Sequence, residues 1–105
     1  MDLKNFFNDY LPDTETILYS VPNGRRTLIK AIKFVSEADI PITVNMKSIR
    51  GTKHARIVPY NFQLCGRSMA DLDELITLES GDKLSAWSGS DRAITCKISG
   101  VEEVL

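Results

Sequence analysis

An alternation of apolar and polar side chains with a period of two runs through most of this sequence and constrains its fold more than any other feature. The stretch ITVNMK at residues 42–47 is a clear example, with three apolar side chains interleaved with three polar ones. Successive side chains of a strand point to opposite faces, so this pattern predicts strands that are buried on one side. Turn signals such as Pro22-Asn23-Gly24 interrupt the alternation roughly every eight to twelve residues. We therefore predict an all-β fold: an antiparallel β-sandwich of about eight strands, jelly-roll-like.

The segment RRTLIKAIKFVS at residues 25–36 carries apolar side chains in both registers of the alternation. The pattern predicts one face formed by Leu28, Ile32 and Phe34, with other apolar residues on the opposite face. A strand that is apolar on both faces is covered on both sides, so we expect this one to be central in its sheet.

The first twelve residues follow a different period. Large apolar side chains recur there at the spacing of one helical face, and they are Leu3, Phe6, Phe7, Tyr10 and Leu11. Asp2 is suited to capping a helix and Pro12 to ending one. The sequence predicts an N-terminal amphipathic helix or arm over residues 1–12 and a β-sandwich domain over residues 13–105. A helix this short is not stable alone, so we expect its apolar stripe to bind a partner, with packing on its own domain as the alternative.

Composition narrows the function classes. The 105-residue chain carries a net charge of −1, which argues against a nucleic-acid-binding role because such proteins are usually basic. No apolar run reaches the roughly 20 residues that a membrane-spanning helix needs, so we expect no membrane partner. The N-terminal residues do not resemble a secretory signal. Cys65 and Cys96 are therefore expected to be free thiols, with Cys96 buried as a small apolar side chain.

Residues with catalytic or ligand-binding chemistry are few. The single histidine, His54, lies among cationic residues and has no cysteine or acid at the spacing of a metal ligand. Asp71, Asp73 and Glu74 form an acidic cluster, but their spacing matches no dedicated calcium loop, and a solvated strand edge is the simpler interpretation. We expect neither an enzyme nor a cofactor.

Two basic turns and one tryptophan are secondary candidates for partner contacts. The residues concerned are Arg25, Arg26, Arg50, Lys53, Arg56 and Trp87. The alternative for the turns is that they are solvated loops. Trp87, together with Tyr60, is also a possible sugar platform, although a lone Trp in a strand more often belongs to a core or an interface.

The segment LESGDKL at residues 78–84 and the final SGVE at residues 99–102 resemble small β-sandwich structural proteins of tailed bacteriophages. The resemblance extends from Thr16 to Val104. In such a turn, Gly81 is expected to adopt a positive φ, and Asp82 to accept hydrogen bonds from nearby backbone N–H groups.

This resemblance implies a non-enzymatic virion protein that is synthesised in the host cytoplasm. It favours a capsid decoration (cement) protein that binds the major capsid protein and forms a homo-oligomer. A neck, tail or baseplate accessory protein is one alternative, and a carbohydrate- or receptor-binding module is another. A metal-dependent cupin-like barrel is disfavoured because the chain has a single histidine.

Overall fold

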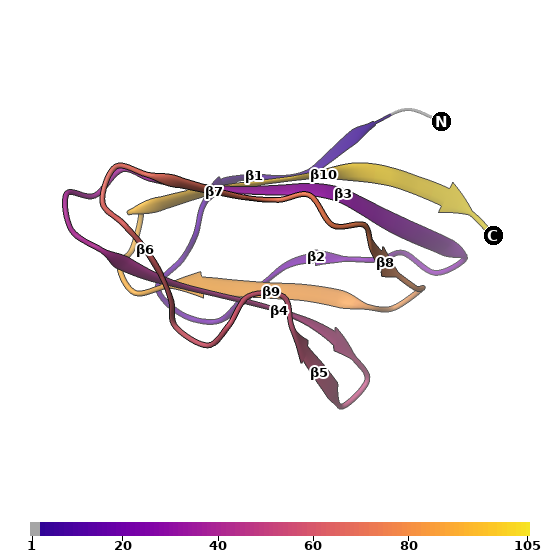
Figure 1. Ribbon diagram of the computed structural model, residues 1–105. Coiled ribbons are helices and arrows are strands. Elements are labelled where there is room, and N and C mark those ends of the chain that lie inside the picture. The colour runs from indigo at the N-terminus through magenta and orange to yellow at the C-terminus, as the bar shows by residue number, and fades with distance from the viewer. Residues whose placement is uncertain (1–2) are drawn as a thin grey trace.

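The computed structural model describes residues 3–105, which form ten β-strands in two antiparallel sheets that lie face to face (Figure 1). This confirms the all-β prediction and gives a sandwich-like arrangement. Within residues 3–105 there is no helix, and hence none that is long and apolar enough to cross a membrane.

Sheet A contains the two long strands and has the order β1-β10-β3-β7, with β8 also paired to β3. Its strands are β1 (Lys4–Tyr10), β3 (Arg25–Ser36), β7 (Met69–Leu72), β8 (Ile76–Leu78) and β10 (Ile94–Val104). β7 and β8 pair with successive parts of β3, so together they form one interrupted edge. The prediction that β3 is central in its sheet is confirmed.

Sheet B has the order β2-β9-β4-β5, with β6 also paired to β4. Its strands are β2 (Thr16–Ser20), β4 (Ile42–Arg50), β5 (Lys53–Arg56), β6 (Phe62–Leu64) and β9 (Lys83–Ser88). The β4–β5 hairpin extends away from the rest of the sandwich (Figure 1). All strand pairs in both sheets are antiparallel.

The core lies between the sheets, and its largest wholly buried side chains include Phe34, Ile32, Met46, Leu84 and Ile98. The predicted face of β3 is partly wrong, because Ile29 takes the buried position expected for Leu28. A β-bulge causes the change.

In this bulge, Ser99 faces Ala31 and Gly100 faces Ile29, so Lys30 has no partner on β10. An extra residue in one strand shifts the following side chains to the opposite face. Gly100 permits the close approach, because a Cβ there would overlap the carbonyl oxygen of Leu28.

The predicted N-terminal helix is wrong. The segment forms β1, which pairs with β10 at the edge of sheet A. A second bulge leaves Phe6 without a partner between Asn5 and Phe7, and both phenylalanines pack against the core. Because the bulge adds one residue to the strand, the apolar residues of β1 recur at the spacing expected of a helical face. The predicted helix cap, Asp2, lies outside the described residues.

Candidate functional site

The two sheets are closed at one edge and open at the other. At the closed edge, β1 and β2 are neighbours, and the rings of Phe6 and Tyr19 lie 4.8 Å apart between centroids. The Tyr19 hydroxyl forms a 2.6 Å hydrogen bond with the hydroxyl of Thr27. At the other edge, β5 belongs to sheet B and β7–β8 belong to sheet A, and no strand pairing joins them.

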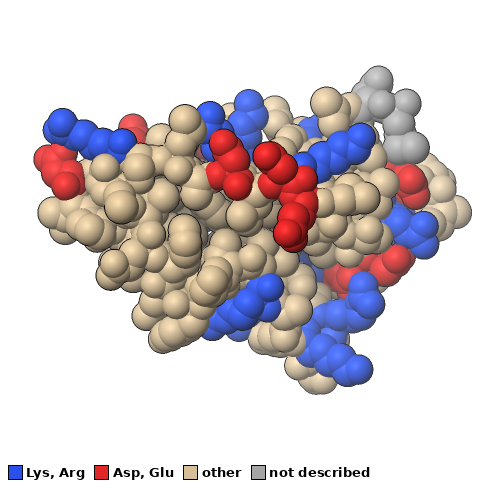
Figure 2. All heavy atoms as spheres, in the orientation of Figure 1, with Lys and Arg blue, Asp and Glu red and all other residues tan. Residues whose placement is uncertain are grey.

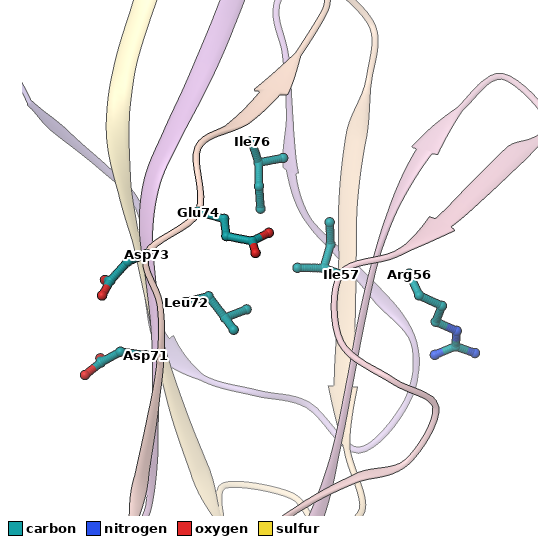
Figure 3. Close-up of a pocket in the computed structure, with 7 residues that line it drawn as sticks. All are labelled: Arg56, Ile57, Asp71, Leu72, Asp73, Glu74 and Ile76. Carbon is teal, nitrogen blue, oxygen red and sulfur yellow. The ribbon is translucent and has the colours of Figure 1, made fainter.

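A cleft of about 440 Å³ opens between β5 and the β7–β8 edge. The side chains of Ile57, Leu72 and Ile76 converge in it from both sheets (Figure 3). Glu74 also points into this space, whereas Asp71 and Asp73 point away from it. The side chains that point into the cleft are therefore three apolar ones and the Glu74 carboxylate, while Arg56, Asp71 and Asp73 line its margin.

The cleft continues along the strands into a second cavity of about 320 Å³, and Ile76 lines both. The apolar lining here comes from Ile49 and Leu78, while Lys53 and His54 on β5 supply the polar wall. We call the two cavities together the open-edge cleft.

Acidic and basic side chains occupy different regions of this side of the molecule. Acidic side chains gather near the middle of the face in Figure 2, over the β7–β8 region, and basic side chains gather below them over sheet B. Every residue of β5 is exposed, so its cations are available to a partner. Among residues 3–105, no cluster of three or more histidine, cysteine or acidic residues is arranged to hold a metal ion.

Arg56 lies between two aromatic rings on the outside of sheet B. Its guanidinium carbon is 4.9 Å from the centroid of Tyr60 and 5.7 Å from that of Trp87. The ammonium of Lys47 is 5.8 Å from the same Trp87 ring. Arg56 also donates a 2.9 Å hydrogen bond to the buried side chain of Asn45. Cations thus lie over both rings, but Trp87 is half-buried whereas Tyr60 is 69% exposed.

The turn between β8 and β9 gathers three of the predicted basic residues. Arg26 pairs with Glu79 at 3.1 Å, and Arg50 pairs with Asp82 at 2.7 Å. The Arg25 backbone exchanges two hydrogen bonds with the Ser80 hydroxyl. The two basic turns therefore meet at one end of the sandwich, where acids of the same region offset their charge.

The conformation of this turn agrees with the prediction from its sequence. Gly81 has a φ of +85°, in the left-handed region. Asp82 is almost wholly buried and accepts a 2.9 Å hydrogen bond from the Glu79 N–H. Hydrogen bonding from Arg50 and from this N–H lowers the pKa of the Asp82 carboxyl, while burial acts in the opposite direction.

The residues of the predicted partner-binding stripe have different environments. Leu3 is 69% exposed, whereas Phe6, Phe7 and Tyr10 are half-buried. Leu11 is wholly buried in the domain's own core, so it is not available to a partner. Partner binding by the rest of the segment stays a prediction.

Both cysteines are free, as predicted. Cys65 is exposed, whereas Cys96 is 1% exposed on the inner face of β10. Burial raises the pKa of the Cys96 thiol to about 12. A protonated, inaccessible thiol is unreactive, which fits the predicted packing role.

Comparison with solved structures identifies a similar fold. A pentameric capsid protein from metagenomic phage sequences superposes with a TM-score of 0.51 over 91% of this chain, at 16% sequence identity. A second structure of a pentameric capsid protein from metagenomic phage sequences gives a TM-score of 0.47 at 16% identity, over 95% of this chain. This chain spans 61% and 60% of the length of those chains. No protein-family model matches the sequence, and no curated protein matches it either. At this identity the likeness concerns the fold.

Proposed function

We propose that this chain is a non-enzymatic structural protein of a tailed-phage or prophage virion. The observation that carries the proposal is the fold likeness to a pentameric phage capsid protein, which extends over 91% of the chain. The turn and strand pattern of residues 78–84 and 99–102 points independently to phage β-sandwich proteins. We further propose that the protein forms a homo-oligomer and binds the capsid lattice, with the major capsid protein as its partner.

Copy number in purified particles tests this proposal. Quantitative mass spectrometry of virions from a phage that encodes the chain should detect it in every preparation. Hundreds of copies per particle would support capsid decoration, because a decoration protein follows the symmetry of the lattice. About a dozen copies or fewer would place the protein in the neck, tail or baseplate. Absence from particles would overturn the virion role.

A carbohydrate-binding module is the second candidate, and it depends on Tyr60 and Trp87. Sugar rings stack on open aromatic faces, but Arg56 and Lys47 lie near the Trp87 ring, and Arg56 also lies near the Tyr60 ring. Tyr60 offers more exposed surface. Binding on a glycan array that is lost in Tyr60→Ala would favour this candidate over a lattice-binding role.

A further inference from the structure

We infer that copies of this chain associate head to tail, with the closed β1–β2 edge of one copy docked against the open β5/β7–β8 edge of the next. This inference deepens the homo-oligomer part of the proposed function by naming the two surfaces. Each sheet then continues from copy to copy through new strand pairs, in the manner of strand addition at an exposed sheet edge.

Strand direction permits this arrangement in both sheets at once. The strand orders β1-β10-β3-β7 and β2-β9-β4-β5 each contain four strands, and every neighbouring pair is antiparallel. The first and last strands of each order therefore run in opposite directions. A copy displaced sideways without being inverted places its β1 antiparallel to β7–β8, and its β2 antiparallel to β5. Antiparallel pairing can thus extend across the contact without a change of orientation.

The shapes of the two edges also match. Packing of Phe6 on Tyr19 closes the β1–β2 edge, while the opposite edge is open to form the cleft. Exposed apolar side chains accompany the closed edge, namely Leu3 on the β1 side and Ile17 on β2. Their positions are at the rim of the contact, since the pairing of Ile17 with Ser85, and of Ser85 with Lys47, places Ile17 on the outer face of sheet B rather than in the cleft.

The register of sheet A places opposite charges at the same height. Following the pairs across the sheet, Lys4 faces Gly100, Gly100 faces Ile29, and Ile29 faces Ile76. Lys4 therefore lies at the level where β8 begins, next to the break that holds Glu74. The Lys4 ammonium lies 3.9 Å from Glu102 of its own chain, but the Lys4 side chain is still 53% exposed, and Glu74 points into the cleft. A second copy in this register brings the ammonium of Lys4 to the carboxylate of Glu74.

Sheet B shows the same complementarity. Ile17 faces Ser85, Ser85 faces Lys47, and Lys47 faces Arg56. Ile17 is thus level with Arg56, and the exposed Glu15, two residues earlier in the chain, lies beside the same level. Glu15 pairs with Lys47 of its own chain at 3.2 Å. A second copy would bring this carboxylate toward the basic β5 strand as well, which favours the contact.

Backbone groups at the free edge of β1 are also available for pairing with a strand of a neighbouring copy. Leu11 donates to the carbonyl of Ile94 on β10 at 2.8 Å. Because N–H groups alternate in direction along an antiparallel strand, Tyr10 and Asn8 direct theirs away from β10. Asp9 accepts the bond from Tyr10 N–H at 2.7 Å, and Asn8 N–H is left facing outward as a donor for a neighbouring strand.

The two surfaces are different, so the contact is heterologous. Repeated contacts of this kind produce a ring when the rotation between copies closes, and a filament when it does not. Each copy uses both edges, and a charge reversal at either edge therefore affects every interface.

Sedimentation equilibrium of the full chain, from micromolar to millimolar concentration, tests the inference with a charge swap. Lys4→Glu and Glu74→Lys should each weaken self-association by roughly tenfold or more, because each places like charges together. The double variant should recover the wild-type association constant to within about threefold. Lys97→Glu is the matched control, since it reverses an exposed lysine on β10, one strand in from the edge.

A wild-type chain that is monomeric throughout this range would overturn the inference, as would single variants without effect or a double variant without rescue. Melting curves show whether a variant is folded. If Lys4→Glu is unstable, Glu74→Lys and Asn8→Pro provide the test instead. Asn8→Pro should leave the fold of the single chain intact, because proline removes an N–H that does not bond to β10. Self-association that depends on these edges, in a chain absent from virions, would overturn the proposed function and leave the interface intact.

Discussion

Replacement of Asp82 tests whether the β8–β9 turn is held by its buried carboxylate. Asp82→Ala removes the acceptor of the Glu79 N–H and the partner of Arg50. Asp82→Asn retains a side-chain oxygen for the Glu79 N–H but removes the charge. The comparison separates the backbone hydrogen bond from the ion pair.

The expected loss of stability follows from how exposed Arg50 and Asp82 are. The Arg50 side chain is 64% exposed and returns to water when Asp82 is lost, so the ion pair contributes about 1 kcal/mol or less. The Asp82 side chain is 6% exposed, and its charge-assisted bond to the Glu79 N–H contributes about 1.5–3 kcal/mol. We expect Asp82→Ala to lower the free energy of unfolding by about 3 kcal/mol, and Asp82→Asn by about half as much.

The effect of pH has a defined sign. The pKa of Asp82 is lower in the folded protein than in the unfolded chain, where it is about 3.9. Its stabilisation is therefore present above about pH 4 and is lost as pH falls through the lower folded value. The difference between wild type and Asp82→Asn should be largest near neutral pH and should shrink below about pH 4.

Thermal melts monitored by circular dichroism between neutral pH and acid provide the measurement. For a domain of this size, about 3 kcal/mol corresponds to a drop in Tm of roughly 12–24 °C. Equal losses in the Ala and Asn variants at neutral pH would refute the role of the Glu79 hydrogen bond. An Asn variant whose deficit is unchanged in acid would refute the role of the charge.

Four further predictions concern single features of the fold. Gly81→Val should cost about 1–3 kcal/mol in a melting experiment through backbone strain alone, because no atom lies within 4 Å of the added Cβ and φ is +85°. Gly81→Asn should cost less, and equal losses would contradict the conformational explanation. Gly100→Ala should be more damaging than Gly81→Asn, since its Cβ overlaps the backbone of Leu28; an unchanged Tm would mean that the bulge is absent. A thiol reagent should modify Cys65 in the native protein and Cys96 only after unfolding, whereas a mass lower by two hydrogens would reveal a disulfide. Deletion of β1 should lower Tm or prevent folding, because this strand completes sheet A and packs on the core; a truncated chain as stable as wild type would show that β1 is an independent arm.

Most of the sandwich was predictable because its strands alternate or lie between clear turns. β3 was expected to be central from apolar residues on both faces, and the turn around Gly81 was expected from its residue types. β5, with the sequence KHAR, shows no alternation because all four of its residues are exposed. The predicted number of strands, about eight, was lower than the ten observed in residues 3–105, in part because β1 was predicted as a helix.

The bulges explain the errors in assigning faces. One extra residue at Phe6 turns a strand pattern into helical spacing, and another at Lys30 moves Ile29 to the inside. A bulge depends on which strand lies opposite, and sequence periodicity does not contain that information. At Lys30, the opposing residues Ser99 and Gly100 on β10 belong to a segment that is distant in the chain.

The open-edge cleft was not predicted from sequence. Ile57 follows β5, while Leu72 and Ile76 belong to the β7–β8 region, and the strand order brings them together across two sheets. The acidic cluster gave a partial signal, since Glu74 lies in the cleft. Its neighbours Asp71 and Asp73 point outward, as expected of a solvated edge.

The position of β10 between β1 and β3 has a consequence for how the chain folds during synthesis. β10 follows all the other strands in the chain, yet it supplies the partner for both β1 and the whole length of β3. Sheet A therefore cannot assemble until Val104 has left the ribosome. Until then β3, twelve residues long, exposes an unpaired apolar edge of the kind that promotes aggregation. We expect folding to be slow for a chain of this length, because it depends on pairing between distant segments, and we expect a chaperone that shields β3 to increase the soluble yield.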